Sequence, residues 1–498
     1  MRKRRTIYHN DARHYYLWVF DSPIKMEDAW RPIDEVAGTA VDTFSYCVER
    51  GDGLFYPSKV GLLFGSDKRP FSSAIAWHAW QSMQSLMDRG LDPLQVLIDR
   101  AHDKGMDFFA DLRLATYGGM DPAHKVEGGG RGFAEEEVRQ RHFAVLRELA
   151  EDYPVEGVEL DYPAAFGEPP FFFRADEVES GKEIMTEWVA QVADMVRNRP
   201  GEPGLVGARV FPSEEMNLAQ GLDVCTWLGE GLVDFVLPYH YRYNNLDCDM
   251  DIDWVIEKAH QHDVAVYGIL QHSIRDESTV HDDRRYPRRI YPSSEMVHAA
   301  AANFWNRGVD GLCTWFMKWP LRQQERSILS EIGDPDLVKE RDKRYVFIRR
   351  SEEAASLGYD AYLPLELGEE SYGELFSLPF YIADDIAGAS DRIRQVHLRI
   401  NISNVVTQDR FTVLLNGESL EDETCLRDYG RRDAPRDQWF EFHLERVRPR
   451  RGRNVLEIAL DGRPDLLVGG VRIEEVEVYV QYGPHPTGLR AELRESIG

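Results

Sequence analysis

The feature that most constrains this chain is a regular alternation, over its first two thirds, of short apolar runs with amphipathic stretches of helical period. Such an alternation is typical of parallel strands joined by crossover helices. Eight runs are strand candidates, at residues 16–20, 39–44, 107–114, 157–162, 205–211, 233–240, 264–271 and 311–316. An open, doubly wound sheet rarely needs eight such units, so the count predicts an α/β fold with a closed (β/α)₈ (TIM) barrel.

The stretches between these runs carry helix boundary signals. Asp92 and Pro93 suit the N-cap and first turn of a helix, apolar residues follow at helical spacing, and Gly105 ends the pattern. The range 134–150 has a glutamate-rich first turn and is followed by Pro154. These signals support helices between the predicted strands.

The pattern changes after the last predicted helix, at residues 321–332. Gly333-Asp334-Pro335 and the charged range 339–344 indicate a domain boundary, and no long helical pattern follows. Strand-like runs with glycines between them lie at 396–402, 410–415, 439–444, 454–460 and 471–482. The sequence therefore predicts a catalytic barrel over residues 1–340. An antiparallel, jelly-roll-like β-sandwich over 341–498 would be structural or carbohydrate-binding.

Composition argues against several classes of partner and compartment. The net charge is 59 − 86 = −27, which repels nucleic acid and anionic membranes. There is no apolar run of about 18 residues, so we expect no membrane span. Five scattered cysteines without a CxxC pair indicate reduced thiols, and the basic N-terminus lacks the apolar stretch of a signal peptide. We expect a cytoplasmic protein, with its oligomeric state open.

The richest candidate for chemistry is the predicted strand at 157–162, because catalytic groups of a barrel lie at the C-terminal ends of its strands. Side chains alternate along a strand, so Glu159 and Asp161 share the face opposite the apolar residues and should point toward the barrel axis. Burying two carboxylates is costly unless they are paired or functional. The alternative is a structural ion pair with an inward arginine such as Arg113 or Arg209.

Two further strand ends offer charged candidates. Asp111 and Arg113 share a face by parity, and Arg113 would either clamp substrate or form a salt bridge in the barrel floor. After the run at 205–211 come Ser213, Glu214 and Glu215. Either glutamate could be a general acid above the barrel mouth, but a serine-capped helix with an acidic first turn describes the same residues.

Aromatic and polar side chains gather at the remaining strand ends and predict a sugar-binding platform. Trp315 would be either the floor of a sugar subsite or packing at the barrel rim. The candidate substrate-binding residues are Arg113, Tyr117, Tyr239, His240, Tyr241, Gln271, His272 and Trp315.

These motifs resemble the broad group of glycoside-hydrolase-like barrels found in bacterial proteins of poorly defined substrate. The resemblance covers the barrel and rests on residues 92–106, with their ending His-x-x-Gly, on 109–113 ending in arginine, and on 157–162. It implies that Asp161 is the catalytic centre and that the second domain is similar to sandwich modules appended to glycosidases. Two departures stand out. Pro163 occupies the place of the chitinase-like glutamate, and Glu159 that of the amylase-like arginine, so neither mechanism transfers whole.

The sequence thus predicts a glycosidase that cleaves an O-glycosidic bond of a mono- or oligosaccharide. Asp161 would be nucleophile or base, with Glu214 as the first choice of acid and Glu215 or Glu159 in reserve. We expect no metal and no cofactor. Two other readings stay open: a non-catalytic carbohydrate-binding barrel, and a metal-dependent sugar isomerase or epimerase with His240 and His272 as ligands.

Overall fold

The computed structural model describes residues 2–11, 16–50, 53–115, 122–126, 130–165, 169–240, 245–275, 289–315, 317–318, 320–347, 361–428 and 437–483. The chain forms two compact units. One comprises Met1–Asn244, Asp251–His272 and Arg307–Gly333, and the other comprises Asn245–Met250, Ser273–Asn306 and Asp334–Gly498. The domain boundary expected at residue 340 stays a prediction.

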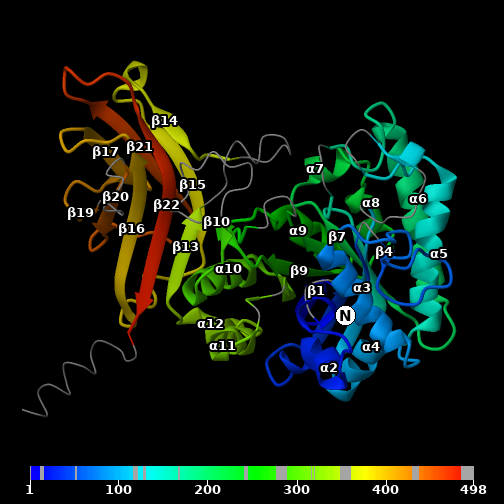
Figure 1. The fold of residues 1–498 in the computed structure, drawn as a ribbon. Helices are drawn as coiled ribbons and strands as arrows, with labels where there is room; N and C mark the ends of the chain where they lie inside the picture. The colour runs from blue at the N-terminus through cyan, green and yellow to red at the C-terminus, as the bar shows by residue number, and fades with distance from the viewer. Residues whose placement is uncertain are drawn as a thin grey trace, which may run out of the picture. The chain divides into compact units, whose positions relative to one another are not determined.

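Eight parallel strands close into a barrel in the first unit (Figure 1). In chain order they are β1 (Arg5–Asp11), β2 (Thr43–Cys47), β5 (Asp107–Arg113), β6 (Gly157–Asp161), β7 (Leu205–Val210), β8 (Phe235–Pro238), β9 (Ala265–Leu270) and β12 (Gly311–Trp315). Each strand pairs with its neighbours in chain order, and β12 pairs with β1 to close the ring. The predicted barrel is confirmed.

Helices connect and flank the strands of the first unit. They are α1 (Tyr16–Val19), α2 (Met26–Asp34), α3 (Ala74–Met87), α4 (Pro93–Asp103), α5 (Glu136–Asp152), α6 (Val178–Arg197), α7 (Glu214–Leu218), α8 (Val224–Gly229), α9 (Asp253–Gln261) and α11 (Gln323–Glu331). The Asp92 side chain caps α4 by accepting from the backbone N–H groups of Leu94 and Gln95, as its position predicts. Among the described residues, none of the helices combines the length and the apolar character that crossing a bilayer requires.

The prediction of a first strand at residues 16–20 is wrong. Residues 16–20 contain the short helix α1, and the strand that closes the barrel is β1, eleven residues earlier at its start. β1 is buried along its whole length, although only Ile7 and Tyr8 within it are large and apolar. Its inward-facing side chains are mostly polar, so it lacks the apolar run by which the other strands were found.

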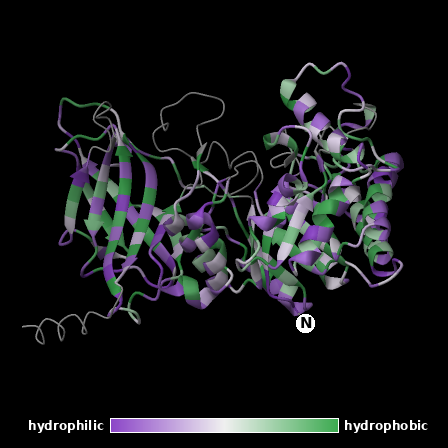
Figure 2. Cartoon of the chain, turned by 60° about the horizontal axis from the view of Figure 1, so that its bottom comes forward, coloured by the Kyte–Doolittle hydropathy of each residue, from purple (hydrophilic) through white to green (hydrophobic). Residues whose placement is uncertain are grey.

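The second unit is built around two antiparallel sheets, which confirms the predicted sandwich. The larger sheet contains β13 (Lys343–Phe347), β14 (Leu365–Leu367), β16 (Ile393–Ser403), β19 (Thr424–Asp428), β20 (Asp437–His443) and β22 (Val471–Tyr482). The smaller contains β15 (Phe376–Ile382), β17 (Arg410–Leu415), β18 (Glu418–Ser419) and β21 (Gly452–Gly462). Hydrophobic and hydrophilic residues alternate along these strands (Figure 2), which is the pattern of sheets with one core-facing side.

Short elements complete the two units. β3 (Glu49–Arg50) pairs with β4 (Gly53–Leu54) in the first unit. In the second unit β10 (Ile274–Arg275) pairs with β11 (Arg289–Ile290), and the helices are α10 (Ser294–Arg307), all but its last residue, and α12 (Pro335–Lys339).

The barrel interior changes character along the strands. Near the middle it is an apolar cluster that includes Phe109, Leu237 and Cys313. Toward the C-terminal ends of the strands the interior becomes charged, with Asp111 following Phe109 on the same face of β5 and Arg209 following Gly207 on β7. The candidate site lies in this charged part.

Candidate active site

Strand register places the charged residues beside one another. Arg113 on β5 pairs with Asp161 on β6, and Asp161 pairs with Arg209 on β7. One step earlier on the strands, Asp111 pairs with Glu159. All five side chains are buried. Glu159 and Asp161 thus both lie inside the barrel, where their parity on the strand predicts them.

Arg209 organises the deeper part of this site. Its Nε donates to Oε2 of Glu159 at 2.7 Å, its Nη2 lies 2.5 Å from the same oxygen, and its Nε lies 3.9 Å from Oδ1 of Asp111. Nη2 also donates to Nδ1 of His9 at 2.8 Å and to the Ser45 hydroxyl at 2.9 Å. The ion pair with Arg209 gives Glu159 a structural role.

The contact with Arg209 also fixes the state of His9 on β1. A guanidinium can only donate hydrogen bonds, so Nδ1 of His9 accepts and carries no proton. The imidazole is therefore neutral, with its proton on Nε2, which lies 3.8 Å from Oδ2 of Asp111. His9 adds no positive charge to offset the carboxylates around it.

Asp161 accepts two hydrogen bonds on a single oxygen. The Tyr239 hydroxyl donates to Oδ1 at 2.8 Å, and the backbone N–H of Ala164 donates to the same atom at 3.2 Å. Oδ2 lies 3.9 Å from Nε of Arg113 and accepts no hydrogen bond from the described residues. Oδ2 is thus the oxygen of Asp161 that can turn to a substrate or a water molecule.

Trp315, at the end of β12, packs among the charged side chains. The guanidinium carbons of Arg113 and Arg209 lie 5.8 and 5.7 Å from its ring centroid, within the range of cation–π attraction. Its ring meets His9 edge-on at 4.7 Å and lies 5.4 Å from the ring of Tyr239. The aromatic face predicted as either subsite floor or rim packing is buried against the charged groups.

Among the described residues, the site holds more acidic than basic groups. Four carboxyls lie together in the interior, those of Asp11, Asp111, Glu159 and Asp161, against the two guanidiniums of Arg113 and Arg209. Arg113 donates to Oδ2 of Asp11 at 2.9 Å. Burying two uncompensated negative charges is expensive, so protons are expected to remain on part of the set.

Asp111 is the carboxyl best placed to keep a proton. Desolvation raises the pKa of Asp111 well above its ordinary value, the Arg209 guanidinium opposes this, and the charges of Asp161 and Glu159 add to it. Neither oxygen of Asp111 accepts a hydrogen bond from the described residues. Nothing among these residues therefore stabilises its charged form by hydrogen bonding.

Asp161 lies in a contrasting environment. Desolvation raises its pKa as well, but Arg209, Arg113 and the hydrogen bond from Tyr239 all act in the opposite direction. Burial also raises the pKa of the Tyr239 phenol well above its ordinary value, which keeps this group a donor. The pKa of Asp161 is still raised overall, but less than that of Asp111, so Asp161 is the more readily ionised of the two neighbouring carboxyls. A difference in pKa between two neighbouring carboxyls is a common basis for assigning one as the acid and the other as the base.

The structure places the predicted acids of α7 elsewhere. Glu214 and Glu215 are exposed in its first turn, which the Ser213 side chain caps by accepting from the N–H of Met216. Oε1 of Glu214 accepts from the Cys225 thiol at 3.1 Å. Neither glutamate forms a hydrogen bond or ion pair with Asp161 in the described part of the chain. Their role as acid stays a prediction.

The remaining predicted residues divide into two groups. His240 and Gln271 are buried, and the Gln271 amide donates to the backbone oxygen of His240 at 3.2 Å, while His272 is half-buried. Tyr117 and Tyr241 lie outside the described residues. The described side chains that could hold a metal together do not include His240 or His272, so the isomerase reading gains no support from a ligand set.

Sequence reasoning missed His9 and Asp11 as parts of the site because the first strand was placed at residues 16–20, and it missed Ser45 because the second strand was expected to end at residue 44. The available signal was the alternation of Ile7, His9 and Asp11 directly after the basic N-terminal residues. Asp111 was noted only as sharing a face with Arg113.

The fold and its charged interior define a closed (β/α)₈-barrel protein with an antiparallel β-sandwich. No protein-family model matches the chain, and no curated protein matches it. Solved structures similar to it include a Paenibacillus cycloisomaltooligosaccharide glucanotransferase (11% identity, TM-score 0.35, 95% of this chain and 57% of that one). They also include an alpha-L-fucosidase from Bacteroides thetaiotaomicron (12% identity, TM-score 0.38, covering 92% and 93%). A third is a beta-1,4-mannanase (11% identity, TM-score 0.39, covering 67% and 99%). These likenesses are too remote to assign a family or an activity.

Proposed function

We propose that this chain is a glycoside hydrolase that cleaves an O-glycosidic bond of a mono- or oligosaccharide with two carboxyl groups. The observation that carries the proposal is the pair formed by Asp161 and Asp111. The two lie on adjacent strands of a barrel interior, where hydrogen bonds and arginines make the first more readily ionised than the second, whose oxygens accept no hydrogen bond from the described residues. Glycoside hydrolysis needs one carboxylate and one carboxylic acid on the two sides of an oxocarbenium-like centre.

Asp161 is the nucleophile or base in this proposal. Its place at the C-terminal end of β6 is where barrel enzymes carry reacting groups. Tyr239 and the Ala164 N–H hold Oδ1, which leaves Oδ2 to attack the anomeric carbon or to activate a water molecule. The buried rings of Trp315 and Tyr239 pack against each other beside it.

Asp111 is the proposed proton-holding partner, and Glu214 and Glu215 are the alternative acids. Glu159 fits the role less well, because Arg209 already contacts its Oε2 through two nitrogens in a buried ion pair. A carbohydrate is the expected partner of the barrel.

The test is hydrolysis of a panel of aryl glycosides by the wild-type chain and by Asp161→Asn. This substitution keeps the shape of the side chain and removes its charge, and should lower kcat by about 10³-fold or more with the fold intact. Unchanged turnover in that variant would remove Asp161 from the mechanism. Sugar binding without hydrolysis of any substrate would favour the non-catalytic barrel.

The acid is identified by varying the leaving group. A phenol of low pKa departs without a proton, whereas a phenol of high pKa needs general acid help. The variant that lacks the acid should therefore hydrolyse only the activated substrates at a near-normal rate. Comparing Asp111→Asn, Glu214→Gln and Glu215→Gln on both kinds of substrate assigns the role to one of the three.

A further inference from the structure

The larger sheet of the sandwich has a polar face that includes three potential metal ligands. Along β16, Val396, Leu398 and Ile400 are buried, while His397 and Arg399 between them are half-buried and so lie on the opposite face. This face is independent of the barrel and of the proposed hydrolysis.

Strand register brings the three ligands together. His397 on β16 lies directly opposite His443 on β20, and Arg399 lies opposite Glu441. His443 and Glu441 are two residues apart on one strand, so they share a face. The result is a compact patch of two imidazoles and one carboxylate, with an arginine at its fourth corner.

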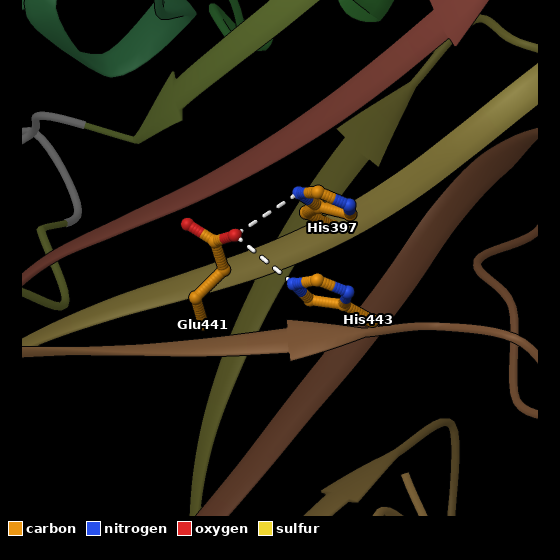
Figure 3. Close-up of side chains that lie close together, drawn as sticks. All are labelled: His397, Glu441 and His443. Carbon is orange, nitrogen blue, oxygen red and sulfur yellow. Dashed lines mark hydrogen bonds and ion pairs between the residues drawn. The ribbon is translucent and has the colours of Figure 1, made fainter. Parts of the chain in front are cut away.

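The ligand atoms already converge on one another (Figure 3). Oε1 of Glu441 lies 3.1 Å from Nε2 of His443 and 3.3 Å from Nδ1 of His397. All three atoms lie within 4.8 Å of one another. Two ligands bound tetrahedrally to zinc at 2.0–2.1 Å are about 3.3 Å apart, so two of the three separations have the value that zinc needs.

The two rings must turn to bind the same ion. They are stacked, with centroids 4.2 Å apart and planes 9° from parallel, whereas a nitrogen lone pair lies in the plane of its own ring. The side chains of His397 and His443 are 16% and 32% exposed, which leaves them space to rotate toward a shared ion.

Arg399 orients the carboxylate. Its Nε lies 3.2 Å from Oε2 of Glu441, so it holds the oxygen that faces away from the histidines. Arg399 is itself fixed by Glu477 at 3.0 Å and by the ring of Trp439 at 4.2 Å. This ion pair engages the second oxygen of Glu441, although the contact does not have the geometry of a hydrogen bond.

Charge also bears on the patch. The positive charge of Arg399 close by weakens the attraction for a cation, although the chain as a whole carries −27. We therefore expect weaker binding than at an all-acidic or cysteine-rich site.

We infer that His397, Glu441 and His443 form a binding site for a divalent transition-metal ion, with Zn²⁺ the best match. Two imidazoles and a carboxylate suit zinc, whereas calcium and magnesium prefer sets of oxygens. Three protein ligands leave a position for water. The bound ion joins β16 to β20 and stabilises the sandwich.

The experiment uses the full chain, stripped of metal with a chelator and titrated with ZnCl₂ by calorimetry. His443→Gln and Glu441→Gln each remove one ligand. Each variant should bind one equivalent of zinc at least about tenfold more weakly than the wild type. The matched control is His102→Gln, because His102 and Glu156 form a similar contact at 3.2 Å that contains only one imidazole. That control should bind zinc as the wild type does.

Two further outcomes decide the inference without relying on one variant. Zinc should raise the melting temperature of the wild-type chain but not that of Glu441→Gln, because binding only the folded state stabilises it. An absence of zinc binding by the wild-type chain would overturn the site outright. Equal affinity in the wild type and in His443→Gln, with both variants folded by circular dichroism, would show that the trio is only a hydrogen-bonded network.

Discussion

Replacing Tyr239 with phenylalanine tests the electrostatic account of Asp161 most directly. The substitution removes one hydroxyl, which donates at 2.8 Å to Oδ1 of a fully buried carboxylate, and leaves the N–H of Ala164 as its other donor. A hydrogen bond to a charged group contributes about 1.5–3 kcal/mol, whereas one to a neutral group contributes about 0.5–1.5 kcal/mol. The penalty for losing the hydroxyl should therefore be larger when Asp161 is ionised.

The sign follows from linkage. The folded-state pKa of Asp161 lies above its ordinary value, so stability falls as pH rises from the unfolded-state pKa through the folded-state pKa. Tyr239→Phe raises the folded-state pKa further, because it removes a bond that favours the charged form. The stability gap between wild type and variant should thus widen with rising pH, by about 1 kcal/mol or more across the titration.

The assay is thermal unfolding of the full chain over a series of pH values, which needs no knowledge of the substrate. Tyr267→Phe is the matched control. Its tyrosine also lines the barrel, but its hydroxyl donates at 2.7 Å to the backbone oxygen of Lys3 and to no carboxylate. A gap for Tyr239→Phe that stays constant with pH, like that of Tyr267→Phe, would refute the reasoning. In an activity assay, the acidic limb of the pH profile should move to higher pH by about 0.7 unit or more, because one pKa unit corresponds to about 1.36 kcal/mol.

Three further substitutions probe other charged groups. Asp111→Asn should gain stability over the wild type as pH rises above the ordinary carboxyl range, because the raised pKa of Asp111 makes its ionisation costly; unfolding at several pH values measures this, and a constant difference would contradict it. Glu159→Gln should destabilise the fold by about 3–5 kcal/mol in a denaturant titration, because it leaves the buried Arg209 without its ion-pair partner. The control is Glu179→Gln, which removes an exposed ion pair, and an equally small change in both variants would count against the buried pair. Desolvation raises the pKa of Glu423, but three backbone N–H donors lower it overall, so Glu423→Gln should destabilise the sandwich at neutral pH. This loss of stability should disappear as pH falls through the folded-state pKa of Glu423. A loss that persists in acid would show that the three donors are unimportant.

The barrel and the sandwich could be predicted because burial leaves a direct mark on most strands. The run at 157–162 and its neighbours are apolar on the helix-facing side, and parity alone placed Glu159 and Asp161 on the inner side. β1 could not be found in the same way, because its inner face carries His9 and Asp11 in place of aliphatic residues. A strand that supplies the charged part of a barrel loses the signal by which strands are recognised.

Contacts across the barrel could not be predicted from the sequence. Asp161 and Tyr239 are 78 residues apart, and the state of Asp161 depends on the hydrogen bond between them. Parity identified Asp111 as inward-facing, but its lack of hydrogen bonds from the described residues follows only from the three-dimensional arrangement. Similarly, Glu441 reads as an ordinary strand glutamate until the register of β16 and β20 places it beside two histidines.

The pairing of β1 with β12 has a consequence for the order of folding. Arg5 lies opposite Gly311 and His9 lies opposite Trp315, so β1 cannot complete its pairing until about three hundred further residues have been made. Contacts of such long sequence separation form late and slowly. Until β12 arrives, His9 and the carboxyls near it remain hydrated through the open seam, and their protonation follows bulk water. Closure of this seam therefore both completes the barrel and sets the charge state of its interior.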